Sequence, residues 1–252
     1  MWWLIPLFLA GFVLVHLSKM LRLYLVLMEH KIGFGRFVLL YLKTTLVNLI
    51  IPFKLGELYR IFCISRETKH WQVGVLSILV DRFFDTLALC IILIPLDVFL
   101  YGKLSFITLL FLAVMVLIGI CYVSVLPTYK YLNRYLIREK SSPRAMAALK
   151  GLDVVKIWYD FTQNLISGRF ALILLFSFAG WIFEVGTLKV LAYYMELPFG
   201  VGDFTTYIQA IFGVGSMGLL KPYTIDSIVL MFAFTVVGFV MMFIKSRSKK
   251  KA

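Results

Sequence analysis

The sequence is poor in the residues that build metal sites, disulfide frameworks and soluble surfaces. Only 15% of its 252 residues are charged, and it contains three cysteines and three histidines. Cys63, Cys90 and Cys121 lie in or beside apolar segments at no ligand or disulfide spacing, and the histidines do not cluster with them. We therefore expect no metal site, no cofactor and no disulfide framework.

What the chain has in abundance is apolar residues, which make up 62% of it. This composition excludes an ordinary soluble domain and predicts an all-α polytopic membrane protein. The formal net charge is +13, from 26 basic and 13 acidic residues. The basic residues fall between the apolar blocks and form no single patch with exposed aromatic residues, so we expect no nucleic-acid partner.

Five apolar blocks predict membrane spans, since a spanning helix needs about 20 mostly apolar residues. The first block, residues 2–17, has no basic residue before it and no evident cleavage site after it. We expect it to be retained as a span, with Lys19 and Arg22 following it. The other four spans are predicted at residues 71–95, 104–126, 170–195 and 223–244.

Lysine and arginine in the connecting segments predict the orientation of these spans. The basic residues gather in segments 19–36, 66–69, 130–169 and 245–251. The connection 96–103 contains one basic residue, and the connection 196–203 contains none. We therefore predict a multi-pass protein of the plasma (inner) membrane, with its N-terminus outside and its C-terminus in the cytoplasm.

Two further blocks are short and broken. Residues 37–52 end at Pro52, and residues 204–220 are interrupted by glycines. The predicted orientation fits best if residues 37–65 form a re-entrant helical hairpin from the cytoplasmic side and the second block forms one from the outer side. The chain would then be an inverted repeat, a pattern typical of transporters that bind substrate where the two halves meet. The alternative is eight ordinary spans, two of them short and tilted.

The predicted organisation has three parts. Residues 1–126 form the first membrane half, residues 127–169 a basic cytoplasmic loop, and residues 170–252 the second membrane half with a basic tail. Within the loop, polar residues recur with helical periodicity over residues 150–163, which predicts an amphipathic interfacial helix. A helix that docks a partner is the alternative for this segment.

The predicted topology places about ten charged residues in the membrane. At roughly 3 kcal/mol each at a helix centre, their exposure to lipid would cost on the order of 30 kcal/mol. Asp81 and Asp85 give one helix an excess of negative charge, which predicts Arg60 or Lys54 as the balancing cation. The candidate substrate-binding residues are Asn48, Lys54, Glu57, Arg60, Asp81, Arg82, Asp85 and Glu184. A purely structural ion-pair network is the alternative.

Pro52 and Gly56 give the charged segment its predicted shape. Proline removes a backbone donor and glycine permits a close approach, so the backbone can open there and present polar groups. These two residues, with Gly213, Gly215 and Gly218, are the candidate hinges. The arginine and lysine side chains suit a phosphate, whereas the carboxylates suit an amino head group or protons.

At these residues the sequence resembles the lysylphosphatidylglycerol synthase transmembrane family, also called flippase-like domain proteins. The matched pattern is Asn48, Pro52, Gly56, Glu57 and Arg60, followed by Asp81, Arg82 and Asp85. It departs from the family at Asp81, where glutamate is more usual, and at FGVGSMGLL, where the family often has a Pro-Gly-Gly-x-Gly-like turn. The resemblance implies a domain that moves a lipid head group between leaflets. We expect no synthase activity, because the chain ends soon after its last span.

The leading hypothesis is a lipid transporter or flippase for a phosphate-containing lipid of the aminoacyl-phospholipid, glycolipid or polyprenyl-phosphate type. Its partners would be membrane lipids, and a homo-oligomer or a partner enzyme stays open. One alternative is a non-transporting accessory subunit of a lipid or glycan assembly complex. An intramembrane enzyme acting on lipid phosphates is a weaker alternative, because no nucleophile, histidine base or metal constellation accompanies the carboxylates. We therefore expect no enzymatic activity.

Overall fold

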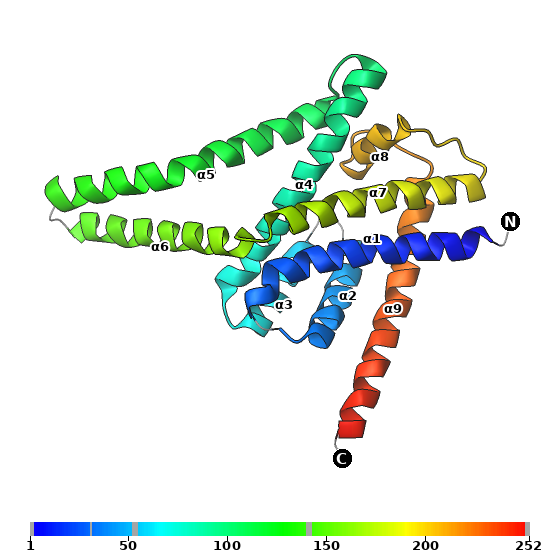
Figure 1. Ribbon diagram of the computed structural model, residues 1–252, viewed down its shortest axis with the longest axis horizontal. Helices are drawn as coiled ribbons and strands as arrows, with labels where there is room; N and C mark the ends of the chain where they lie inside the picture. The colour runs from blue at the N-terminus through cyan, green and yellow to red at the C-terminus, as the bar shows by residue number, and fades with distance from the viewer. Residues whose placement is uncertain (1–2, 31, 52–54, 140–142, 250–252) are drawn as a thin grey trace.

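The computed structural model describes residues 3–30, 32–51, 55–139 and 143–249, which are helical along most of their length (Figure 1). No strand occurs in these ranges, as the all-α prediction requires. The elements are α1 (Leu4–Leu27), η1 (Met28–His30), α2 (Phe34–Ile50), α3 (Gly56–Thr68), α4 (Trp71–Tyr101), α5 (Phe106–Glu139), α6 (Pro143–Ile166), α7 (Phe170–Tyr194), α8 (Asp203–Ile211) and α9 (Leu220–Lys249).

Within the described residues, five helical segments are long and apolar enough to cross a membrane, which agrees with the predicted number of spans. They are Leu4–His30, Trp71–Tyr101, Phe106–Arg138, Phe170–Tyr194 and Leu220–Ile244. The boundary predicted after residue 17 is wrong, because α1 continues and includes Lys19 and Arg22. Residues 20–27, MLRLYLVL, are apolar except for Arg22 and extend the helix. Both cations form ion pairs with carboxylates inside the protein.

Helices α1 and α7 run antiparallel along each other through the middle of the fold (Figure 1). Gly11 of α1 lies so close to Thr187 of α7 that an added Cβ atom would be 2.5 Å from the threonine hydroxyl. At the other end of the pair, the Arg169 guanidinium donates to the carbonyl oxygen of Leu25 at 3.1 Å. Small residues allow such close approach between membrane helices. This α1–α7 pair joins the beginning of the chain to its last third.

Helices α2 and α3 form an antiparallel helical hairpin beside α4. At one end the charged atoms of Arg36 and Glu67 lie 3.9 Å apart. At the other end Gly56 packs on Asn48, where an added Cβ atom would overlap the asparagine backbone. Only glycine fits there, so the predicted hinge residue closes the hairpin sterically. Its entry into the membrane from the cytoplasmic side stays a prediction.

The other predicted hinges differ from one another. Pro52, together with the candidate ligand Lys54, lies outside the described residues. Gly213 and Gly215 have φ angles of 77° and 109° in the turn that follows α8, a backbone region that glycine enters without a steric penalty. Gly218 has neither a positive φ nor a close neighbour, so it is not required by the turn.

The second broken block does not have two helical arms of its own. Its only helix, α8, has nine residues, residues 212–219 form turns and irregular backbone, and the chain then enters α9. Glycine in a helix interior costs about 1 kcal/mol relative to alanine, so this glycine-rich segment has little reason to form a second arm. The inverted repeat with an outer re-entrant hairpin stays a prediction.

The segment predicted as a basic loop is largely helical. Helix α5 continues past residue 126 to Glu139 and is followed by α6, which contains the predicted amphipathic segment 150–163. The two helices run antiparallel and extend away from the other helices (Figure 1). The rings of Tyr122 and Tyr159 stack at 4.8 Å, and the Tyr129 hydroxyl donates to Asp153 at 3.0 Å.

Candidate functional site: a charged cavity among the helices

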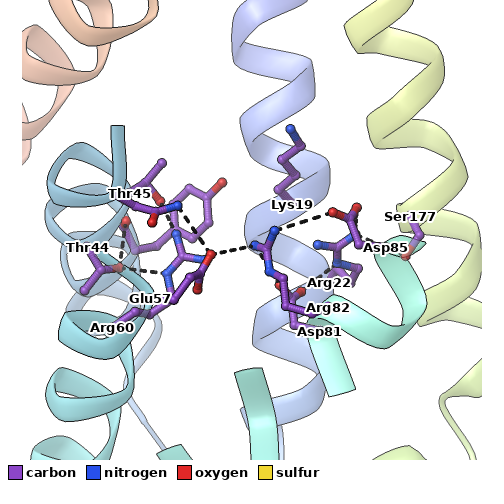
Figure 2. Close-up of polar contacts among 12 residues, drawn as sticks. Lys19, Arg22, Thr44, Thr45, Glu57, Arg60, Asp81, Arg82, Asp85 and Ser177 are labelled. Atoms are coloured by element: carbon purple, nitrogen blue, oxygen red, sulfur yellow. Dashed lines mark hydrogen bonds and ion pairs between the residues drawn. The ribbon is translucent and has the colours of Figure 1, made fainter. Parts of the chain in front are cut away.

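The centre of the charged cluster is Arg22 of α1, which is 1% exposed. Its guanidinium donates to Asp81 and to Asp85 of α4, in each case at 2.6 Å, and to the Ser177 hydroxyl of α7 at 3.3 Å. Figure 2 shows the arginine lying against both aspartates. Short charge-assisted bonds of this kind are the strong ones. Arg22 therefore fixes three helices to one another.

Arg22 was not among the predicted site residues, because the predicted first span ended before it. The signal that could have found it is local, since Lys19 and Arg22 are three residues apart and are followed by another apolar stretch. On a helix that spacing puts both cations near one face. An interaction of these two cations with the two aspartates of α4 would then have been a candidate ion-pair network.

Arg60 or Lys54 was predicted to balance these aspartates; the expectation is wrong for Arg60, and Lys54 lies outside the described residues. The Arg60 guanidinium donates to the hydroxyls of Thr44 at 3.4 Å and Thr45 at 3.0 Å, both on the partner arm of the hairpin. It also lies 3.6 Å from Glu57, one turn away on its own helix. Because α1 rather than the hairpin supplies the counter-ion of α4, Arg60 serves to hold α2 and α3 together.

Arg82 joins the two groups (Figure 2). Its guanidinium nitrogens lie 3.3 Å from Asp81, 3.4 Å from Glu57 and 3.6 Å from Asp85. These separations are longer than the 2.6 Å bonds of Arg22, and the Arg82 side chain is 44% exposed. Arg82 is thus the loosely held cation of the cluster, with guanidinium donors available to a ligand.

The second predicted half contributes Glu184 of α7. Lys19 donates to its carboxylate at 2.5 Å, and the Tyr207 hydroxyl donates to the other oxygen at 2.9 Å. The Lys19 ammonium also lies 5.6 Å from the centre of the Trp181 ring. The sequence predicted Glu184 as a site residue but predicted neither of these partners.

Two buried acceptor atoms at the hairpin end make no hydrogen bond to the described residues. They are the side-chain oxygen Oδ1 of Asn48 and the carboxylate oxygen Oε2 of Glu57. The Asn48 amide donates to the other Glu57 oxygen at 3.3 Å, so the pair is only half satisfied. Buried polar atoms without partners are costly, and they mark a place where a hydrogen-bond donor would be favourable.

These residues surround a cavity of about 490 Å³, which we call the central cavity. Its polar wall contains Lys19, Asn48, Arg82, Asp85 and Glu184, from four different helices. A smaller cavity of about 130 Å³ lies against the same cluster and is lined by Arg22, Arg60 and Asp81 among others. The predicted candidates within the described residues are therefore brought to one place, either lining a cavity or, as Glu57 does, contacting a residue that lines it.

Charge in this cluster is balanced among the residues that the structure describes, which do not include Lys54. The four cations are Lys19, Arg22, Arg60 and Arg82, and the four carboxylates are Glu57, Asp81, Asp85 and Glu184. Among the residues that the structure describes, no group of histidine, cysteine and acidic side chains has the arrangement of a metal site. The site can bind ions and dipoles by direct contact, through guanidinium, ammonium, amide and carboxylate groups.

Comparison with known proteins gives one match. The model of the lysylphosphatidylglycerol synthase TM region covers residues 1–247. No curated protein and no solved structure matches the chain significantly. The matched range contains the five apolar helices and every residue of the charged cluster. The chain therefore belongs to the family of the lysylphosphatidylglycerol synthase transmembrane region.

Proposed function

We propose that this protein moves a phosphate-containing lipid between the two leaflets of a membrane, the lipid being of the aminoacyl-phospholipid, glycolipid or polyprenyl-phosphate type. The observation that carries the proposal is the central cavity, which holds cations and carboxylates among helices long enough to cross a bilayer. Charged side chains at membrane depth are costly unless they pair or face a polar cavity. In the central cavity the charged side chains would bind the lipid head group in place of the water that the head group loses as it crosses the membrane.

Arg82 is the residue we assign to the lipid phosphate. It lines the cavity, it is half-exposed, and its three carboxylate contacts lie between 3.3 and 3.6 Å. A guanidinium offers several donors in a plane that matches phosphate oxygens. Arg22 is a poor candidate, because its donors are already used in short bonds to the aspartates of α4.

The hairpin end of the cavity supports a second contact. Asn48 Oδ1 and Glu57 Oε2 make no hydrogen bond to the described residues, and Asn48 lines the cavity. A hydroxyl or amino donor of a head group would satisfy Asn48 Oδ1, whereas Glu57 Oε2 does not line the cavity and lies 3.6 Å from the Arg60 guanidinium. New hydrogen bonds from the Arg82 guanidinium to the phosphate and from the head group to Asn48 would together offset part of the cost of removing the head group from water.

The proposal places the protein in the plasma membrane, with its N-terminus outside and its C-terminus in the cytoplasm. An odd number of spanning helices puts the two ends on opposite sides, and the basic residues between 245 and 251, which follow the last apolar span, favour the cytoplasm for the C-terminus. The proposed activity breaks and forms no covalent bond, so the protein acts as a transporter and not as an enzyme.

The test uses purified protein in vesicles that contain a tail-labelled phospholipid, glycolipid or polyprenyl phosphate, with a membrane-impermeant quencher added outside. Wild-type protein should let the quencher reach more label than the roughly half exposed in protein-free vesicles, for one of the three lipid types. Arg82→Ala should slow this movement at least tenfold. Arg66→Ala is the matched control, because Arg66 is exposed on α3 and lies outside the cavity.

The proposal would be overturned if none of the three lipids crossed the membrane faster in vesicles with wild-type protein than in protein-free vesicles. Equal rates for wild type and Arg82→Ala would leave a transporter but remove Arg82 from the site. If no lipid moves and a lipid- or glycan-assembling enzyme co-purifies with the chain, the accessory-subunit hypothesis takes its place.

A further inference from the structure

The central cavity contains an ammonium group of the protein itself, on Lys19. This ammonium is held by the carboxylate of Glu184 at 2.5 Å and faces the Trp181 ring at 5.6 Å. The Lys19 side chain is 27% exposed, whereas that of Glu184 is 7% exposed. The carboxylate is thus fixed in the wall, and the ammonium is the more accessible member of the pair.

Aromatic rings complete the wall around this ammonium. Trp181 of α7, Tyr207 of α8 and Tyr223 of α9 all line the cavity, and the two tyrosine rings meet edge to face at 6.3 Å. Tyr207 also donates to Glu184 and so fixes the carboxylate from the far side. A carboxylate beside the face of a tryptophan ring, as Glu184 is beside the Trp181 ring that faces Lys19, can bind a primary or quaternary ammonium ion through charge and cation–π attraction.

We propose that Lys19 occupies an ammonium-binding subsite, and that the ligand of this cavity is a zwitterionic phospholipid head group that inserts into the Lys19–Glu184 ion pair. The ligand ammonium takes the place of the Lys19 ammonium at Glu184 and Trp181. The displaced Lys19 and Arg82 then bind the ligand phosphate. The inference rests on the proposed function, because it selects for the same cavity a phospholipid whose head group carries both a phosphate and an ammonium, as that of an aminoacyl-phospholipid does.

Charge balance favours this class over a purely anionic lipid. The cluster has equal numbers of cations and carboxylates, so a neutral zwitterion enters without leaving an excess charge. An anionic head group that drew Lys19 away would leave Glu184 buried with only the Tyr207 hydroxyl as partner. An unpaired buried carboxylate is strongly unfavourable, whereas insertion of a zwitterion replaces one ion pair by two.

The dimensions of the cavity agree with such a ligand. Its volume of about 490 Å³ lies within the usual range of about 300–1,000 Å³ for small-molecule sites. Arg82 and Asn48 line it together with the aromatic residues around Glu184, so one cavity offers both a phosphate contact and an ammonium contact. The ring contacts are apolar enough to accept methyl groups on the ammonium as well.

The experiment measures lipid binding to the full-length protein in mild detergent by native mass spectrometry. Phosphatidylethanolamine and phosphatidylcholine are compared with phosphatidylglycerol of the same acyl chains. The zwitterionic lipids should bind at least tenfold more tightly than phosphatidylglycerol to wild-type protein. Glu184→Gln should remove this preference. Asp226→Asn should keep it, because the Asp226 carboxylate lies in a separate apolar pocket between α1, α7 and α9.

A second probe tests the exchange itself. A single-chain alkylammonium amphiphile, which carries no phosphate, should bind at least tenfold more tightly to Lys19→Met than to wild type, because Glu184 is then free to accept it. A Lys19–Glu184 pair with a purely structural role would give no such increase. The comparison of lipids on wild-type protein remains decisive if a variant does not fold.

Equal binding of zwitterionic and anionic lipids to wild type would overturn the inference, as would a preference that survives Glu184→Gln. These outcomes differ from failure of the proposed function. If lipids move across vesicles but bind without head-group preference, transport stands and the subsite is wrong. If the preference is present but no lipid moves, the subsite stands and transport is wrong.

Discussion

Replacement of Arg22 by methionine should destabilise the protein strongly, because it removes the cation that two carboxylates share. Methionine keeps an unbranched, apolar side chain but leaves Asp81 and Asp85, whose side chains are 2% and 15% exposed, without their 2.6 Å partner. Removal of one member of a buried ion pair costs about 3–5 kcal/mol. In a chain of this size each kcal/mol shifts Tm by about 2–4 °C, so Tm should fall by about 6–20 °C.

Thermal unfolding of the purified protein in mild detergent measures this change. Arg36→Met is the matched control, because the Arg36 side chain is 77% exposed and lies 3.9 Å from Glu67. Exposed pairs of this kind contribute about 0–1 kcal/mol. The double variant Arg22→Met, Asp81→Asn removes one cation and one carboxylate together, leaves Asp85 its contact with Arg82 at 3.6 Å, and should recover most of the lost stability.

Two results would refute the reasoning. If Arg22→Met unfolds at the same temperature as Arg36→Met, the buried network contributes little to stability. If Arg22→Met is destabilised but the double variant is not restored, the loss comes from packing around the guanidinium stem and not from an excess of buried carboxylates.

Three further substitutions separate the roles of other residues. Gly56→Val should make the α2–α3 connection more sensitive to protease than Gly33→Val does. An added Cβ atom would overlap α2 at Gly56, whereas it would meet nothing within 4 Å at Gly33, so equal sensitivity of the two variants would contradict the close packing. Asp97→Ala should cost about 1–3 kcal/mol in thermal unfolding, since the buried carboxylate accepts bonds at 2.6–3.1 Å from α5, α8 and the α4–α5 connection; an unchanged Tm would rule out this link. Arg82→Gln should shift Tm by less than about 2–4 °C, because its ion pairs are long and its side chain is half-exposed; a larger fall would make Arg82 structural.

Hydrophobic length was sufficient to predict the spanning helices. The block predicted at residues 170–195 corresponds to Phe170–Tyr194, and the block that begins at residue 71 corresponds to α4, which starts at Trp71. These boundaries depend on local properties, namely a run of apolar residues and the polar segments beside it. Such properties are visible in one stretch of sequence.

The pairing of charges depends on contacts between distant segments, and the sequence did not determine it. Asp81 could be balanced by several cations, and the choice of Arg22 over Arg60 requires that α1, and not the hairpin, lie against α4. The boundary at residue 17 also followed a rule that places cations outside spans. That rule fails where a carboxylate of another helix is available, as Asp81 is for Arg22.

The same limit applies to Glu184. The sequence marks it as an unusual charge in an apolar helix, but its partner Lys19 is 165 residues away. The fold brings the two together through the α1–α7 pair, whose close approach at Gly11 is a matter of side-chain size. No periodicity or motif in either helix indicates that contact.

The distance along the chain between these partners has a consequence for biosynthesis. Arg22 precedes Asp81 by 59 residues, and Lys19 precedes Glu184 by 165. At about 5–20 residues per second, the ribosome needs about 10–30 s to deliver the glutamate after the lysine. Asp81 follows Arg22 after about 3–12 s at the same rate, so α1 first carries two unpaired cations and then one, each unfavourable by about 3 kcal/mol at a helix centre. The first helix must therefore wait at the insertion machinery, or near the bilayer surface, until later helices arrive to receive it.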